Sequence, residues 1–158
     1  LDQELPRTVC GRCGRTRGAK TLTPQKGACV STGLIYPARL SGNCLCGGVR
    51  YRIDGPVRGV VNCYCSQCRK TSGHYVAATR VALEHLELQE SETLEWYESS
   101  PGVRRGFCRR CGGNLFWSGG ASKEWSVMAG TLDTPTGLQT VANIHEKDAS
   151  DYHAIPDV

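Results

Sequence analysis

The sequence predicts a mainly β protein, a small domain whose strands are held together by cysteine-bound metal. Two observations support this fold class. Short stretches that alternate apolar and polar residues lie between glycine-rich turns, a pattern typical of small β domains. The 158 residues also include ten cysteines, several of them in the closely spaced pairs that bind zinc.

The composition is that of an ordinary globular protein, with 39% hydrophobic and 22% charged residues. The length suffices for one domain with a genuine core. No run approaches the ~18 apolar residues of a membrane span, and no signal-peptide pattern is present. We therefore expect a cytoplasmic protein without membrane contact, whose cysteines are metal ligands rather than disulfides.

The first forty residues differ from the others in charge and composition. Residues 1–40 contain seven Lys/Arg against two acidic residues, a net charge of +5, whereas residues 41–158 carry −1. The segment is rich in Gly, Arg and Thr and lacks apolar periodicity. We predict that residues 1–40 form a basic, poorly ordered extension and that residues 41–158 form the zinc domain. The alternative is a third metal site at Cys10, Cys13 and Cys29, for which the segment offers no fourth Cys or His.

The strands are expected where alternating patterns occur. Residues 49–53 alternate like a half-buried strand, and Asp54-Gly55-Pro56 predicts a turn after it. A second strand over residues 57–62 leads into the central cysteines. Residues 81–89 fit either a short helix or a strand. Further strands are predicted over residues 74–79, 94–98, 114–117 and 125–129.

Four cysteines in two short loops predict a closed structural zinc site. Cys44 and Cys46 supply two thiolates, and Cys108 and Cys111 supply two more. Glycines follow each pair, where a tight knuckle needs positive φ. Four cysteine ligands are typical of structural zinc, which contributes folding free energy directly.

Three further cysteines, Cys63, Cys65 and Cys68, lie within six residues. Neighbours this close rarely meet disulfide geometry, but they can surround one soft metal ion. Three ligands leave a fourth position open to water or substrate, as in catalytic zinc sites. A fourth protein ligand would close the site instead; the candidates are a cysteine of the extension or His74, His85, His145 or His153.

Two basic residues, Arg69 and Lys70, directly follow the third cysteine. An open three-cysteine zinc favours a thiol ligand, and zinc lowers the pKa of that thiol below its free value of ~8.5. Arg69 and Lys70 are candidates for binding the carboxylates of such a ligand. The alternative is that they are solvated surface charges.

Four motifs in order give a specific resemblance. They are Gly42-x-Cys44-x-Cys46-Gly47, Cys63-x-Cys65-x-x-Cys68-Arg69-Lys70-x-x-Gly73, Arg105-x-Phe107-Cys108-x-x-Cys111-Gly112 and Gly130-Thr131-Leu132-Asp133. Over residues 41–155 the chain resembles the glutathione-dependent formaldehyde-activating enzyme family, which includes centromere protein V. It departs from the family at Tyr64, where His is frequent, and at Tyr152, where Trp is common.

The resemblance implies a β-tent fold with two zinc ions. It assigns the structural zinc to Cys44, Cys46, Cys108 and Cys111 and the catalytic zinc to Cys63, Cys65 and Cys68. It also implies a carbon–sulfur lyase of the S-(hydroxymethyl)glutathione synthase type. Its partners would be glutathione or a similar thiol and a small aldehyde, joined into an S-hydroxymethyl adduct or released from it.

A second hypothesis comes from a different class of protein. In this alternative the domain is a noncatalytic, zinc-stabilised binding module that carries a thiol, or that binds nucleic acid or protein through the basic extension. The sequence favours the enzyme, because a charge of +5 spread over forty residues is modest for nucleic-acid binding.

Overall fold

The structure, a computed structural model, describes residues 34–158, which belong to one compact unit. This unit is mainly β, as predicted, and consists of ten strands, one α-helix and three short 3-10 helices. Their bounds are β1 Ile35–Asn43, β2 Arg50–Arg58, β3 Val60–Cys63, α1 Ser66–Ser72, β4 Val76–Ala82, η1 Leu83–His85, β5 Leu86–Glu90, β6 Leu94–Ser100, β7 Val103–Cys108, β8 Asn114–Gly119, β9 Glu124–Met128, η2 Ala129–Thr131, β10 Thr140–Ile144 and η3 Glu146–Asp148.

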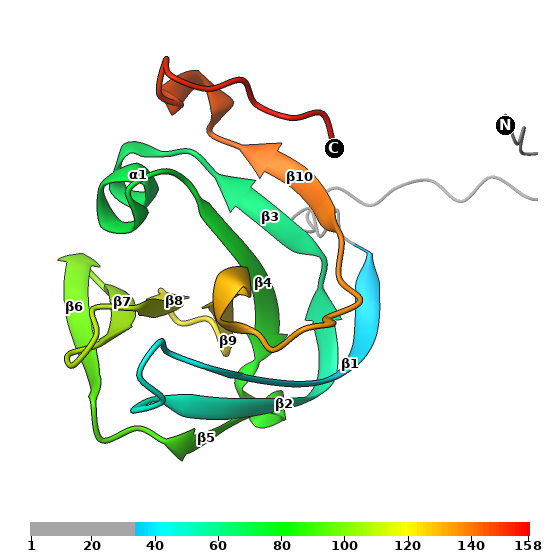
Figure 1. Ribbon diagram of the computed structural model, residues 1–158, viewed down its shortest axis with the longest axis vertical. Coiled ribbons are helices and arrows are strands. Elements are labelled where there is room, and N and C mark those ends of the chain that lie inside the picture. Colours follow the sequence, from blue (N-terminus) through cyan, green and yellow to red (C-terminus); the bar gives the residue numbers. More distant parts are fainter. Residues whose placement is uncertain (1–33) are drawn as a thin grey trace, which may run out of the picture. The chain divides into compact units, whose positions relative to one another are not determined.

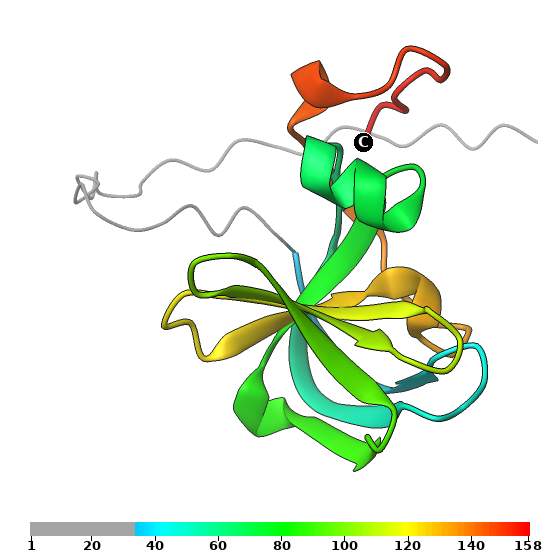
Figure 2. The ribbon, with the colours of Figure 1, turned by 90° about the vertical axis from the view of Figure 1, so that its left-hand side faces the viewer.

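The strands form one branched, open sheet. Its main path runs β1-β2-β4-β9-β8-β7-β6, with antiparallel neighbours throughout. β3 continues the direction of β2 and also pairs with β4, while the late strand β10 lies parallel to β3. Figure 1 shows that the sheet is strongly curved and that α1 follows the end of β3. The view in Figure 2 shows the same curvature from the side.

The main core is built mostly from buried side chains of β2, β4, β8 and β9. Alternate residues of β2 point inward, so that Tyr51, Ile53 and Val57 are fully buried. Tyr51 packs edge-on against Phe116 of β8, with ring centroids 5.2 Å apart, and its hydroxyl bonds to that of Thr131 at 2.6 Å. The alternation predicted for this strand is therefore the one that builds the core.

The N-terminal boundary of the folded unit differs from the prediction. Strand β1 begins at Ile35, and residues 35–40 pair with β2 in unbroken register. Leu40 packs against the core. The predicted boundary before Ser41 thus falls inside a strand, because the early residues of an edge strand carry little apolar pattern of their own. Residues 1–33, with Cys10, Cys13 and Cys29, lie outside the described residues.

The predicted turn at Asp54-Gly55-Pro56 is wrong, because these residues continue β2. Pro56 lies opposite Pro37 of β1. Opposite residues in an antiparallel pair alternate between bonded and non-bonded positions, and a proline fits the non-bonded position because no N–H is needed there. A Gly-Pro sequence can therefore stay extended where only one neighbouring strand is paired with it.

Three further elements were not specified by the sequence. Residues 81–89 complete β4, turn through η1 and continue as β5, so they are mainly strand. The helix α1 and the strand β10 were not predicted. Both are short, and β10 finds its partner β3 about eighty residues earlier in the chain.

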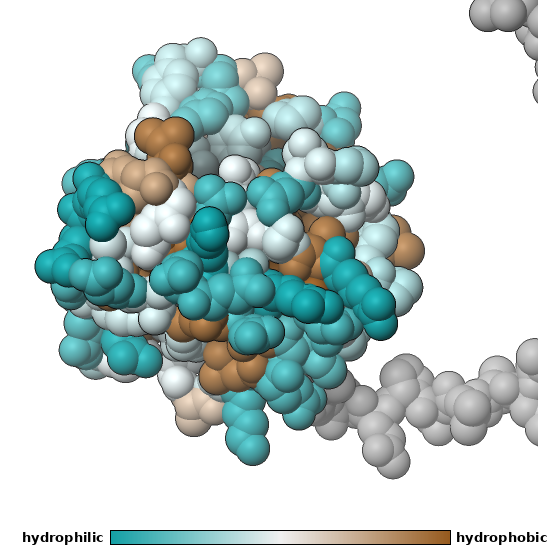
Figure 3. Space-filling view, turned by 60° about the horizontal axis from the view of Figure 1, so that its bottom comes forward, coloured by the Kyte–Doolittle hydropathy of each residue, from teal (hydrophilic) through white to brown (hydrophobic). Residues whose placement is uncertain are grey.

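Figure 3 shows a face that is mainly hydrophilic, with hydrophobic side chains in small separate patches. Within residues 34–158, no helix is both long and apolar enough to cross a membrane.

Candidate metal centres and substrate cavity

The structure brings Cys44, Cys46, Cys108 and Cys111 together, as the spacing predicted. All four sulfurs lie within 4.8 Å of one another, and the sulfur of Cys46 is 3.7 Å from those of Cys44 and Cys108. Sulfurs around a tetrahedral zinc are ~3.8 Å apart, so this group has the donor type and the spacing that zinc requires.

Each cysteine loop is closed by a backbone hydrogen bond from the glycine that follows its second cysteine. The backbone N–H of Gly47 bonds to the carbonyl of Cys44 at 3.0 Å, and that of Gly112 bonds to Cys108 at 2.7 Å. Both glycines have φ of +73°. Only glycine adopts this conformation without strain, which is why each knuckle ends on one.

The quartet stabilises negative charge through its own hydrogen bonds. Burial opposes ionisation of Cys108, but the hydroxyl of Thr93, 3.2 Å away, and backbone N–H groups outweigh it and lower the pKa of Cys108 to about 6. The backbone N–H of Val49 likewise lies 3.3 Å from the sulfur of Cys44. At Cys46 the backbone of Gly48 favours the thiolate, but desolvation and the bonds with Cys44, Cys108 and Cys111 outweigh it and raise the pKa to about 11. Without metal, the hydrogen bonds therefore favour a thiolate at Cys108 and a protonated thiol at Cys46.

The second cluster contains Cys63, Cys65 and Cys68, with all three sulfurs within 4.8 Å of one another. Cys63 ends β3, Cys65 is the N-cap of α1, and Cys68 lies in the first turn of that helix. The sulfur of Cys65 accepts from the backbone N–H of Cys68 at 3.5 Å. The helix is what turns the CxxC spacing back toward the strand end, and it stops at Gly73, whose φ of +83° suits glycine.

Among residues 34–158, no fourth Cys, His, Asp or Glu joins this trio of sulfurs. His145 lines the adjoining cavity. The ring of His85 lies 3.7 Å from the carboxylate of Glu84. His74 and His153 pack against each other, with ring centroids 4.2 Å apart. The trio thus differs from the quartet in having three ligand atoms from the described part of the chain.

The trio shares its protons unequally. The hydrogen bond from the Cys68 thiol lowers the pKa of Cys63 to about 5. The same bond, together with burial, raises the pKa of Cys68. Without metal, the group therefore holds a thiolate on Cys63 that is bonded by its neighbours.

A buried arginine from another strand contacts the trio. Arg105 of β7 is only 8% exposed, and its Nη1 lies 4.0 Å from the sulfur of Cys68. Its Nη2 donates to Oε1 of Gln67 at 2.7 Å, and its Nε is buried with no partner among the described residues. A buried cation at this position offsets the negative charge of three thiolates.

A cavity of about 400 Å³ opens beside the trio. This is within the ~300–1,000 Å³ typical of small-molecule sites. All three cysteines line it, while Val76, Ala78 and Met128 pack around them as an apolar wall. The charged and titratable side chains that complete the lining are Arg58, Arg80, Arg105 and His145.

The two basic residues singled out in the sequence lie elsewhere. Arg69 is directed toward the C-terminal segment, where its Nη1 donates to Ser150 Oγ at 2.8 Å. Lys70 is exposed, and neither residue lines the cavity. The arginines that do line it were missed, because they lie on three different strands and share no local motif.

These features define a class of protein: a small β domain with one closed four-cysteine cluster and one three-cysteine cluster open to a cavity. Residues 39–148 match the family described as glutathione-dependent formaldehyde-activating enzyme. The chain belongs to this family, which confirms the resemblance seen in the motifs.

Two similar proteins are informative. A Halomonas elongata protein that bears the provisional name glutathione-dependent formaldehyde-activating enzyme is 37% identical over 86 residues, which are 49% of this chain and 54% of that protein. The match thus spans about half the length of the curated relative. The crystal structure of a Rhodobacter sphaeroides protein superimposes with a TM-score of 0.53 at 23% identity, covering 65% of this chain and 98% of that one. At this identity the likeness concerns the fold alone.

Proposed function

We propose that the protein is a zinc-dependent carbon–sulfur lyase that binds a glutathione-like thiol and joins it to a small aldehyde, or cleaves the resulting S-hydroxymethyl adduct. The observation that carries this proposal is the position of Cys63, Cys65 and Cys68. They form a three-sulfur group at the wall of a cavity of small-molecule size. The sequence family supports the same substrates.

We assign a structural zinc to the quartet and a catalytic zinc to the trio, within a zinc-stapled β-tent fold. Both sites fit zinc by donor type and spacing. A bound zinc would act as a Lewis acid that lowers the pKa of the incoming thiol and holds it in place. Charge stabilisation and proton transfer are then provided by the protein's own side chains.

The forward reaction forms one C–S bond and adds one proton to the aldehyde oxygen. The thiolate sulfur attacks the carbonyl carbon of the aldehyde, a C–S bond forms, and the π electron pair moves to the oxygen, which takes up a proton. The reverse direction returns that proton and breaks the C–S bond. No electrons are exchanged with an external redox partner.

Two side chains that line the cavity serve this step: Arg105 stabilises the thiolate charge, and His145 exchanges the proton. Arg105, held by Gln67, stabilises the negative charge at the sulfurs. His145 follows Ile144, whose pairing with Cys63 between β10 and β3 fixes its position beside the trio. Its Nδ1 lies 3.9 Å from the carboxylate of Asp148. We assign His145 the proton exchange with the adduct oxygen, because imidazole transfers protons near neutral pH.

Thiol binding to the cobalt-substituted protein tests the proposal. Glutathione should change the ligand-field and charge-transfer bands of the trio's cobalt and release close to one proton, because a thiol coordinates as thiolate. S-methylglutathione cannot form a thiolate and should leave the bands unchanged. Equal effects of the two ligands, or no effect of either, would refute thiol coordination.

The alternative of a noncatalytic module has less support. Its nucleic-acid form depends on the basic residues 1–40, of which residues 1–33 lie outside the described residues. The described part instead offers an enzyme-like cavity beside a reactive cysteine group.

A further inference from the structure

A row of side chains crosses five strands along the wall of the cavity. Arg105 of β7 is paired with Trp117 of β8, Trp117 with Ser126 of β9, and Ser126 with Arg80 of β4. Arg58 of β2 follows Val57, which is paired with Val81, so Arg58 and Arg80 are neighbours across the two strands. All five side chains line the cavity.

The row has a cation at each end. Arg105 is the first residue of the row and lies beside Cys68. Arg58 and Arg80 are at the other end of the row, where Arg58 bonds to the carbonyl of Ala78, a residue that packs against the trio. With strands about 4.8 Å apart, the three steps from Arg105 to Arg80 amount to about 14 Å along the sheet. Because these side chains project into the cavity, the distance that a ligand must span between their guanidinium groups is shorter than the distance along the sheet.

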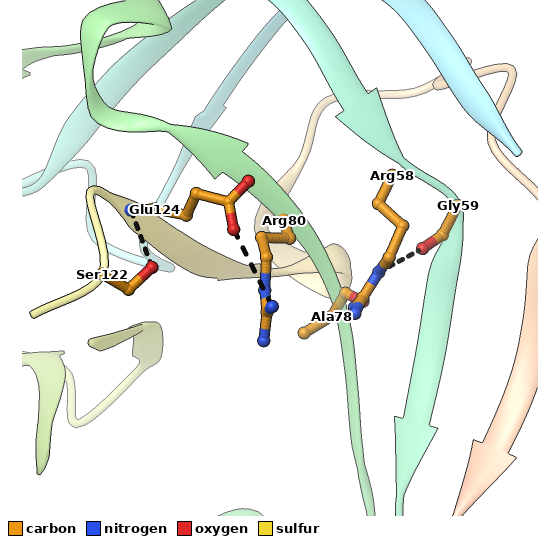
Figure 4. A network of polar contacts seen from close by, with 6 residues as sticks. All are labelled: Arg58, Gly59, Ala78, Arg80, Ser122 and Glu124. Atoms are coloured by element: carbon orange, nitrogen blue, oxygen red, sulfur yellow. Dashed lines mark hydrogen bonds and ion pairs between the residues drawn. The ribbon is translucent and has the colours of Figure 1, made fainter. Parts of the chain in front are cut away.

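The positive charge of Arg58 and Arg80 is only partly neutralised by the acidic side chains around them. Arg58 donates from Nε to Gly59 O at 3.2 Å and from Nη2 to Ala78 O at 3.1 Å, so its bonds are to neutral carbonyls. Figure 4 shows Arg58 reaching toward Ala78, and Arg80 toward Glu124. Like charges side by side on adjacent strands are unfavourable. Consistently, burial and the charge of Arg80 lower the pKa of Arg58.

Glu124 does not remove this excess. Its carboxylate lies 3.8 Å from Nη1 of Arg80, and both side chains are about half exposed, at 49% and 41%. Such a long, solvated pair contributes little. No Asp or Glu lines the cavity among residues 34–158, and Arg80 has no hydrogen-bond acceptor there.

We propose that Arg58 and Arg80 bind a carboxylate of the thiol substrate, whose sulfur lies at Cys63, Cys65 and Cys68 in the same cavity. Ser126, next to Arg80 in the row, adds a hydroxyl donor. The substrate class is then a thiol that carries a carboxylate several bonds from its sulfur, such as a short peptide thiol. A thiol without a carboxylate would lack this contact. This inference rests on the proposed function.

Isothermal titration calorimetry of the zinc-loaded chain of residues 1–158 tests the assignment. The ligands are glutathione, its diethyl ester, in which both carboxylates are masked, and S-methylglutathione. Arg80→Gln is the informative variant, because Arg80 holds no backbone group, whereas Arg58 does. Arg50→Gln is the matched control, since Arg50 is exposed on the same strand as Arg58 and lies outside the cavity.

Charge-assisted hydrogen bonds predict that the wild type binds the diester about 10- to 100-fold more weakly than glutathione. Arg80→Gln should lose this preference, whereas Arg50→Gln should keep it. Equal affinity of the wild type for glutathione and diester, equal behaviour of the two variants, or no binding of either tripeptide would overturn the assignment. If the carboxylate assignment is right but the thiol does not coordinate zinc, glutathione and S-methylglutathione should bind equally. Arg80→Gln should then weaken the binding of both ligands.

Discussion

Nη1 of Arg105 lies 4.0 Å from the sulfur of Cys68, which links strand β7 to helix α1. The same strand ends at Cys108, a member of the four-cysteine cluster. One strand of six residues therefore connects both cysteine groups. A metal that fixes the end of β7 also fixes the arginine that faces the trio, so the quartet contributes to the cavity as well as to the fold.

The contact predicts that Arg105 supports metal binding by the trio. Arg105→Gln should weaken the trio's metal affinity about 10- to 100-fold, the usual effect of losing a group that contacts the ligands. Competition with a chromophoric chelator measures this. Arg104→Gln is the control, because the exposed Arg104 lies over the ring of Trp96 at 5.1 Å, away from the cysteines. Unchanged affinity in Arg105→Gln would contradict the role given to the contact.

The two clusters should differ in what their loss does to the protein. Cys108→Ser removes a fully buried quartet ligand and should prevent stable folding, because a structural zinc contributes ~10 kcal/mol or more, comparable to the whole stability of a domain. Cys65→Ser should keep the fold and reduce the metal content from two ions per chain to one. Thermal unfolding and metal analysis by mass spectrometry check both. A Cys65→Ser protein as unstable as Cys108→Ser would argue against the division.

The pKa values within the trio predict selective alkylation after its metal is removed. Because the pKa of Cys63 is lowered to about 5, its thiolate persists well below the ordinary thiol pKa of ~8.5. The stabilisation from this thiolate is complete above the ordinary pKa and is lost as the pH falls through about 5. Cys68 has a raised pKa and stays protonated.

Iodoacetamide at pH 6 should therefore modify Cys63 before Cys68 in protein that retains the quartet metal. Peptide mass spectrometry across a pH series measures the order. The prediction fails if all three trio cysteines are modified with one midpoint near the free thiol value.

The division of the cysteines was predictable because ligand spacing is local. Cys44 with Cys46, and Cys108 with Cys111, each need only a short turn and a glycine to bring two sulfurs together. The strand over Tyr51 and Ile53 was predictable for a similar reason, since alternation decides which side chains enter the core.

The chemistry of the cavity wall was not predictable, because it depends on register. Arg58, Arg80 and Arg105 become neighbours of one cavity only when five strands pair in a particular alignment. Similarly, His145 reaches the cavity beside the trio through the parallel pairing of β10 with β3. Arg69 and Lys70 directly follow Cys68 in the sequence, but α1 directs Arg69 toward Ser150.

The start of β1 gives a last prediction, which compares two deletions of the N-terminal segment. Removing residues 1–33 should leave the unit folded with two metal ions, because all seven described cysteines and all of β1 are kept. Removing residues 1–40 also deletes Ile35 to Leu40, their pairing with β2, and the contacts of Tyr36, Ala38 and Leu40 with the core.

The longer deletion should lower the free energy of unfolding by several kcal/mol, since each lost apolar side chain contributes ~1–3 kcal/mol when fully buried and these three are only partly buried. Urea unfolding measures the difference, and metal analysis of the shorter deletion tests the extension. Equal stability of the two deletions would show that β1 contributes little. Loss of one metal ion from the protein lacking residues 1–33 would show that Cys10, Cys13 or Cys29 closes the trio, and the open site that the proposed thiol chemistry requires would then not exist.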